Sequence, residues 1–199
     1  MGQPCEDRDS KHNWRTRLLA ERDAVPAEIR TAEASALALT ARNVIPADGR
    51  AVCGYVPIGT EPGALSLLDT LVEAGHRVLL PVVTGQTALD WAEYEGADAL
   101  VAGPFGLREP AGDRLGPDAL GTAGTLLVPA LAVDLNGVRL GRGAGHYDRS
   151  LPLASENAVL IAVVRDEELV TELPAEQHDV RMTAALTPGR GLVTLRSTE

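Results

Sequence analysis

The chain has 199 residues, of which 45% are hydrophobic and only 3% aromatic, so one sizeable α/β domain with a core of Leu, Val and Ala is expected. Its 28 acidic residues outnumber its 18 Lys and Arg residues and give a formal net charge of −10. This balance excludes a broad duplex-binding surface, because such a surface needs an excess of basic residues on one face.

The first forty residues predict two helices behind a loose N-terminus. We expect residues 1–10 to be flexible and residues 11–199 to form one domain. From Lys11 to Ala24 apolar residues recur at helical spacing, and Pro26 fits the first turn of a second helix that runs to about Asn43. An N-terminal helical hairpin therefore opens the predicted fold.

Strand and helix patterns alternate in the next part of the chain. Continuous apolar runs predict buried strands over residues 51–56 and 77–83, with a helix over 62–75 between them and a short strand over 89–94 behind them. Strand, helix and strand in this order form a βαβ unit. Residues 96–124 are rich in Gly, Pro, Ala and Asp, which predicts a long loop of a kind that is often functional.

The last third predicts the rest of a sheet. Apolar runs indicate strands over residues 125–133 and 157–164 and short edge strands over 180–186 and 192–195, and a helix starts within 145–151. The fold class is therefore α/β, with a mostly parallel sheet and helices on both faces. Ligands of such folds bind beyond the carboxyl ends of strands, which here means the loops after Val56 and Val133.

The loop after residue 133 concentrates groups that bind anions. It reads Arg139-Leu140-Gly141-Arg142-Gly143-Ala144-Gly145-His146-Tyr147-Asp148-Arg149. Alternate glycines let backbone N–H groups approach an anion, arginines fit phosphate oxygens, and an aspartate is a ligand that Mg²⁺ prefers. Glycine alternation alone also suits a bare turn, and the spacing is neither that of a Walker A loop nor that of a dinucleotide fingerprint. The combination predicts a nucleotide triphosphate site.

The same residues resemble the signature of the 5-formyltetrahydrofolate cyclo-ligases, also called methenyltetrahydrofolate synthetases. The main match covers residues 128–134, Gly137 and residues 139–148. Shorter matches lie along the chain, at Lys11 with Arg15, Tyr55-Val56-Pro57 with Glu61, Leu80-Pro81, Gly106-Leu107-Arg108-Glu109-Pro110, Pro174 with His178 and Asp179, and Thr187-Pro188. The resemblance implies an enzyme that uses ATP and Mg²⁺ to turn 5-formyltetrahydrofolate into 5,10-methenyltetrahydrofolate, releasing ADP and phosphate. It also implies the fold of the sugar-phosphate isomerases (NagB and RpiA) and CoA transferases.

The resemblance also implies a role for individual residues. The residues implied for ATP are Lys11, Arg15, Arg139, Leu140, Gly141, Arg142, Gly143, Ala144, Gly145, His146 and Tyr147, with Arg142 and Tyr147 also in catalysis. Those implied for the folate are Val56, Glu61 and Phe105, and those implied for Mg²⁺ are Asp148 and Asp179. A carboxylate such as Glu61 can accept paired N–H bonds from a pterin ring. Because a formamide oxygen leaves poorly, transfer of the ATP γ-phosphoryl group to it would activate the formyl carbon.

Several of these residues also have plainer interpretations. Lys11 and Arg15 could form a solvated helix face, Asp179 could be an exposed loop acid, and Phe105 could fill the core. The chain also departs from the family at His146, where members often have a tyrosine.

Two other functions stay open at this point. A non-catalytic nucleotide- or folate-binding relative with a regulatory role is the alternative, and a sugar-phosphate isomerase of the same fold is a third. We expect ATP and a reduced folate as partners, with no nucleic acid and no membrane, and a monomer. Residues 1–12 lack the apolar stretch of a signal peptide, and Cys5 and Cys53 lack metal-ligand spacing, so a cytoplasmic location with reduced thiols is expected.

Overall fold

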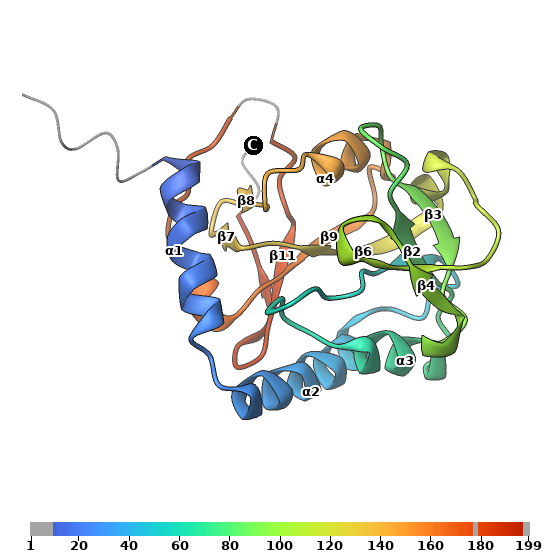
Figure 1. Cartoon of the computed structure of the whole chain (residues 1–199), viewed down its shortest axis with the longest axis horizontal. Helices are drawn as coiled ribbons and strands as arrows, with labels where there is room; N and C mark the ends of the chain where they lie inside the picture. Colours follow the sequence, from blue (N-terminus) through green and yellow to red (C-terminus); the bar gives the residue numbers. More distant parts are fainter. Residues whose placement is uncertain (1–9, 177–178, 197–199) are drawn as a thin grey trace, which may run out of the picture.

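A seven-stranded sheet in the order β12-β11-β9-β6-β1-β2-β3 forms the centre of the computed structural model, which describes residues 10–176 and 179–196 apart from the side chain of Phe105 (Figure 1). Its strands are β1 Ala51–Cys53, β2 Val78–Val82, β3 Asp90–Glu93, β6 Ala123–Pro129, β9 Val159–Val163, β11 Ala184–Thr187 and β12 Gly191–Thr194. The five inner strands are parallel, and β3 and β12 pair antiparallel at the two edges. The predicted α/β fold with a mostly parallel sheet is confirmed.

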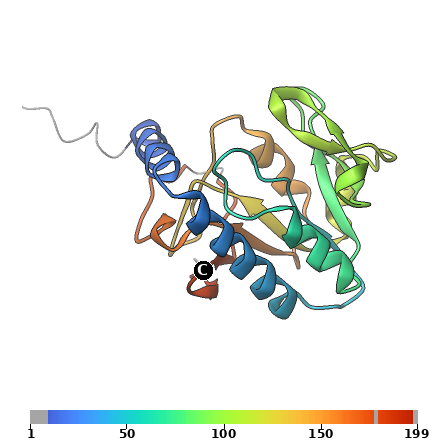
Figure 2. The same ribbon diagram turned by 60° about the horizontal axis from the view of Figure 1, so that its bottom comes forward.

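Each face of this sheet carries its own apolar core, because successive strand side chains point to opposite faces. Leu127 joins the core beneath helices α2 (Ala27–Val44) and α3 (Leu65–Glu73), whereas its neighbours Leu126 and Val128 join the opposite core. Figures 1 and 2 show α2 and α3 side by side on one face, and Figure 1 shows the short α4 (His146–Ser150) on the other.

Helix α1 (Lys11–Asp23) packs on a second, smaller sheet. That sheet has the order β10-β7-β8 and consists of Leu169–Val170, Ala132–Asp134 and Arg139–Leu140. The two predicted N-terminal helices are present and are joined by a short turn, but each packs on a different sheet. Pro26 is the N-cap of α2 rather than a residue of its first turn.

Three predicted elements differ from the structure. The run over residues 125–133 is two strands in two sheets, because the chain bends at Ala130-Leu131, which stay buried and so leave no polar mark in the sequence. The strand predicted over 51–56 ends at Cys53, and the Tyr55 hydroxyl donates to the Pro62 carbonyl in the loop beyond, at 2.7 Å. The predicted loop over 96–124 contains a hairpin of β4 (Leu100–Ala102) and β5 (Arg108–Pro110), with 3₁₀ turns around it.

Some of the predictions fall on residues 1–9, 177–178 and 197–199, which lie outside the described part. They include most of the flexible N-terminus, Cys5 and His178. Among the helices of the described ranges, none is long and apolar enough to cross a bilayer. Cys53 is a buried free cysteine, and burial raises the pKa of its thiol, so it stays protonated at neutral pH.

Candidate active site

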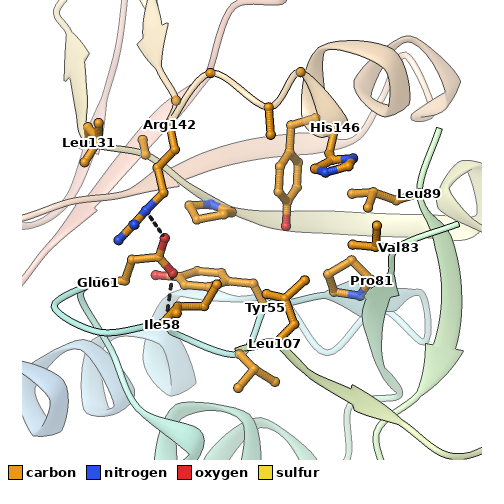
Figure 3. Close-up of a pocket in the computed structure, with 18 of the residues that line it drawn as sticks. Tyr55, Ile58, Glu61, Pro81, Val83, Leu89, Leu107, Leu131, Arg142 and His146 are labelled. Atoms are coloured by element: carbon orange, nitrogen blue, oxygen red, sulfur yellow. Dashed lines mark hydrogen bonds and ion pairs between the residues drawn. The ribbon is translucent and has the colours of Figure 1, made fainter. Parts of the chain in front are cut away.

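A cavity of about 390 Å³ lies between the two loops that the sequence singles out. The loop after β1 contributes Tyr55, Val56, Ile58 and Glu61, and the loop between β8 and α4 contributes residues 141–145. Pro81, Val83, Leu89, Leu107 and Leu131 supply apolar walls (Figure 3). The cavity thus combines apolar walls with charged groups such as Glu61 and Arg142, a combination typical of sites for small molecules.

The loop from Gly141 to Gly145 depends on its glycines for its backbone path. Gly143 and Gly145 have φ angles of +99° and +72°, which residues other than glycine rarely adopt. Two arginines brace the loop through its carbonyl groups. Arg15 Nε donates to Gly141 O at 2.9 Å, and Arg149 Nη2 donates to Ala144 O at 3.1 Å. The loop therefore has a fixed path and several arginines beside it.

An ion pair joins this glycine loop to the loop after β1. Arg142 Nε lies 2.9 Å from Glu61 Oε1, and Glu61 Oε2 accepts a hydrogen bond from Ile58 N–H at 3.0 Å (Figure 3). The Glu61 side chain is 9% exposed and that of Arg142 is 43% exposed. The residue predicted to hold phosphate and the residue predicted to hold the pterin therefore neutralise each other here.

Tyr147 brings a hydroxyl group without a hydrogen-bond partner into the cavity wall. Arg139 lies over its ring at 5.6 Å from the centroid and also forms an ion pair with Asp148 at 2.6 Å. Within the described residues the buried Tyr147 hydroxyl makes no hydrogen bond. Burial, and then the charge of Glu61, raise the pKa of Tyr147, so the hydroxyl stays protonated and can donate to a ligand oxygen.

His146 lines the same cavity as a neutral imidazole. Burial, and then the charge of Arg149, lower the pKa of His146 below its usual value. Its Nδ1 lies 3.4 Å from Arg149 Nη2, and an arginine can only donate, so Nδ1 is the acceptor and Nε2 carries the proton. His146, at the position where the family often has a tyrosine, thus carries one N–H donor in this chain.

Lys11 and Asp179 lie together, outside the residues that line the cavity. Lys11 Nζ is 3.1 Å from Asp179 Oδ2 and 2.9 Å from Glu176 Oε1. Partial burial lowers the pKa of Lys11, but its hydrogen bonds to the two carboxylates outweigh burial and raise it. Lys11 therefore lies one helical turn from Arg15, which donates to the glycine loop, and Lys11 is not part of the cavity wall.

Asp148 is the predicted metal ligand that lies in the cavity wall. In the described part of the chain, no three His, Cys, Asp or Glu side chains cluster to hold a metal ion. A single carboxylate such as Asp148 is a group that can hold Mg²⁺ together with substrate phosphates, since Mg²⁺ commonly uses one or two carboxylates in this way. Of the predicted folate residues, Val56 and Glu61 line the cavity, while the Phe105 side chain lies outside the description.

Comparison with known proteins adds an independent observation. The model of the 5-formyltetrahydrofolate cyclo-ligase family matches residues 7–188. The chain belongs to this family. A 5-formyltetrahydrofolate cyclo-ligase of Mycolicibacterium smegmatis is 53% identical to it over 94% of this chain and 98% of that protein. The Escherichia coli cyclo-ligase is 33% identical over 62% of this chain and 70% of its own.

Solved structures agree with the cyclo-ligase assignment. The Aquifex aeolicus 5,10-methenyltetrahydrofolate synthetase superposes with a TM-score of 0.75 at 26% identity, covering 95% of this chain and 94% of that one. The synthetase of Mycoplasma pneumoniae gives a TM-score of 0.69 at 18% identity, covers 88% and 97%, and supports the fold alone.

Sequence reasoning assigned no site role to several residues that line the cavity of this cyclo-ligase. They are Arg22, Tyr55, Leu107 and Glu109. All but Arg22 fall in blocks that match the family, so the match itself was a signal that could have found them. Arg22 lies in the predicted first helix, where an arginine usually belongs to the solvated face, yet it is only 1% exposed.

Proposed function

We propose that the chain is an ATP-dependent 5-formyltetrahydrofolate cyclo-ligase whose reaction takes place in the cavity beneath the glycine loop. The conversion of 5-formyltetrahydrofolate to 5,10-methenyltetrahydrofolate is the activity that gives its family its name. The placement in this cavity rests on the 2.9 Å contact between Arg142 and Glu61. This contact joins the loop that we propose to bind phosphate to the carboxylate that we propose to bind the pterin.

The proposed chemistry begins with activation of the formyl group. The formyl oxygen attacks the γ-phosphorus of ATP, and the bond from that phosphorus to the bridging oxygen breaks to release ADP. N10 then attacks the formyl carbon, and the former formyl oxygen finally leaves as part of inorganic phosphate. Arg142, Arg139 and the backbone N–H groups of the glycine loop would neutralise the transferring phosphoryl group, and the Tyr147 hydroxyl would donate to an oxygen. The protein's task is positioning and charge neutralisation.

The Arg142–Glu61 ion pair joins two groups that the proposed substrates also need. Arg142 contacts one Glu61 oxygen and Ile58 N–H the other, so a pterin edge that docks on this carboxylate competes with Arg142 for it. The Arg142 side chain is nearly half exposed and can swing toward the nucleotide. We therefore propose that the ligand-free protein keeps these two groups paired until the folate and ATP replace the contacts.

Asp148 is our proposed carboxylate for Mg²⁺, with Asp179 kept as a predicted second ligand. A bound Mg²⁺ would neutralise phosphate charge beside the glycine loop. Asp148 now pairs with Arg139, so the same carboxylate would exchange a guanidinium for the metal.

Asp148→Asn is expected to raise the Mg²⁺ concentration for half-maximal activity at least about tenfold, because an amide oxygen is a weaker Mg²⁺ ligand than a carboxylate. Titration of Mg²⁺ at saturating ATP measures the shift. Asp118→Asn, at an exposed acid in the 3₁₀ helix Pro117–Thr122, is the control and should leave the Mg²⁺ requirement unchanged. An unshifted requirement in Asp148→Asn would argue against metal ligation.

Labelled substrate tests the proposed phosphorylation. With ¹⁸O in the formyl group, the label should appear in the released inorganic phosphate, since the formyl oxygen leaves on phosphorus. Label found in water and absent from phosphate would contradict the route.

The location and assembly of the protein are further proposals. We propose a cytoplasmic monomer with one domain over residues 11–199 and ATP and a reduced folate as its ligands.

A further inference from the structure

Glu109 is a buried carboxylate to which the reaction above gives no task. It lies in β5 and lines the cavity, although the residue is only 6% exposed. Its Oε1 accepts a hydrogen bond from Val83 N–H at 2.9 Å. Within the described part of the chain no donor reaches Oε2, and no Lys, Arg or His forms an ion pair with the carboxylate.

Burial of a carboxylate without a cation is costly, so this arrangement needs a reason. The neighbouring Arg108 points elsewhere, since its Nη2 donates to Ala97 O at 2.8 Å. Gly103 lies directly against the carboxylate, and a Cβ there would come within 2.6 Å of Glu109 Cδ. Glu109 is among the residues that line the cavity, and Oε2 is the oxygen of its carboxylate that receives no donor from the described part of the chain.

The Glu109 carboxylate lies beside Val83, whose N–H donates to its Oε1. In Figure 3, Val83 and Leu89 lie on one side of the cavity and Glu61 and Arg142 on the other. In a reduced folate the 2-amino-4-oxo ring edge lies at one end of the bicyclic ring, and N5 and N10 lie toward the other. A folate that docked this edge on Glu61 would extend N5 and N10 toward the side of the cavity where Val83 holds the Glu109 carboxylate.

We propose that Glu109 is a catalytic residue, the base that takes the proton from N10 during ring closure. This inference rests on the proposed function, which supplies the phosphorylated formyl group. The N10 lone pair forms the bond to the formyl carbon, and the N10 proton passes to Glu109 Oε2. The nitrogen electrons then expel the phosphate with the former formyl oxygen and leave the cationic N5–C–N10 amidinium of the product. Glu109 returns its proton to water once the product leaves.

The base acts after phosphoryl transfer, which gives the test a distinctive readout. Glu109→Gln keeps the shape and a carbonyl oxygen for Val83 N–H but cannot take a proton. Methenyl formation should slow about 10²-fold, the usual size of a general-base effect. In rapid-quench single turnovers, ADP should still form quickly, so that it precedes methenyl formation instead of keeping pace with it. Affinity for 5-formyltetrahydrofolate without ATP should stay close to that of the wild type.

Two further variants keep the test decisive. Glu109→Asp retains a carboxylate, so its rate of methenyl formation should be much closer to that of the wild type than the rate of Glu109→Gln. The delay between ADP release and methenyl formation should also be shorter. If the Gln variant does not fold, the Asp variant is the one that tests the proposal. Glu93→Gln, at an exposed acid paired with Arg77 on the edge strand, should behave as the wild type.

Three results would overturn the assignment of Glu109: wild-type rates in Glu109→Gln, a parallel loss of ADP and methenyl formation, or equal slowing by Asp and Gln. A wild-type protein that forms no methenyl product with ATP would instead refute the proposed function.

Discussion

Replacing Arg142 by alanine should lower kcat/KM for cyclisation about 10³-fold, which corresponds to about 4 kcal/mol of transition-state stabilisation. Arg142 lies within the glycine loop, and its side chain is nearly half exposed. Its planar guanidinium can contact two oxygens of a transferring phosphoryl group. Steady-state kinetics at saturating Mg²⁺ measure the effect, which should fall mainly on kcat and on the KM for ATP.

Two variants separate this role from a general loss of charge. Arg142→Lys keeps the charge without the fork and should recover only part of the activity. Arg17→Ala removes an arginine at an exposed pair with Glu21 and should leave kinetics unchanged. Unchanged kcat and ATP KM in Arg142→Ala would remove Arg142 from phosphoryl transfer.

Glu168→Ala should lower the free energy of unfolding by about 3–5 kcal/mol, the usual cost of leaving one buried charge without its partner. Arg22 is 1% exposed, and its Nε and Nη2 lie 2.6 and 2.7 Å from the two Glu168 oxygens. Arg22 Nη2 also donates to Ala130 O at 2.6 Å, at the bend that leads from β6 into β7. Glu168 further accepts from Arg165 N–H, and Arg165 pairs with Glu33 of α2.

Urea unfolding measures the loss in Glu168→Ala. Glu21→Ala, at the exposed Arg17 pair, should change stability by about 0.5 kcal/mol or less. A comparable small change in Glu168→Ala would show that the buried network contributes little. Because Arg22 also lines the cavity, the destabilised variant should lose activity at lower temperature than the wild type.

Local sequence patterns predicted most helices and strands, because each buried strand is an apolar run and each helix buries one stripe. These patterns gave a wrong strand boundary where the chain changes direction but its residues stay buried. Ala130 and Leu131 are as buried as the strands on either side, so the bend between two sheets has no polar marker. The β4–β5 hairpin was not predicted for the opposite reason. Its strands are only three residues long and partly exposed, so they form no continuous apolar run.

The candidate site was predictable as two loops but not as a set of contacts. The glycine run and Glu61 stand out because their residue types match phosphate and pterin chemistry. The pairing of Arg142 with Glu61, or of Arg22 with Glu168, joins residues far apart in the chain and needs the folded sheet. Glu109 lies in a short block that matches the family, but only its burial, its oxygen without a donor in the described part of the chain and the cavity beside it distinguish it within that block.

The most direct test of the central claim follows absorbance at the methenyl product's band when purified protein is mixed with 5-formyltetrahydrofolate, with and without ATP. The account predicts growth of the band only with ATP, and one ADP for each methenyl product. Product formed without ATP, or no product under either condition, would contradict it.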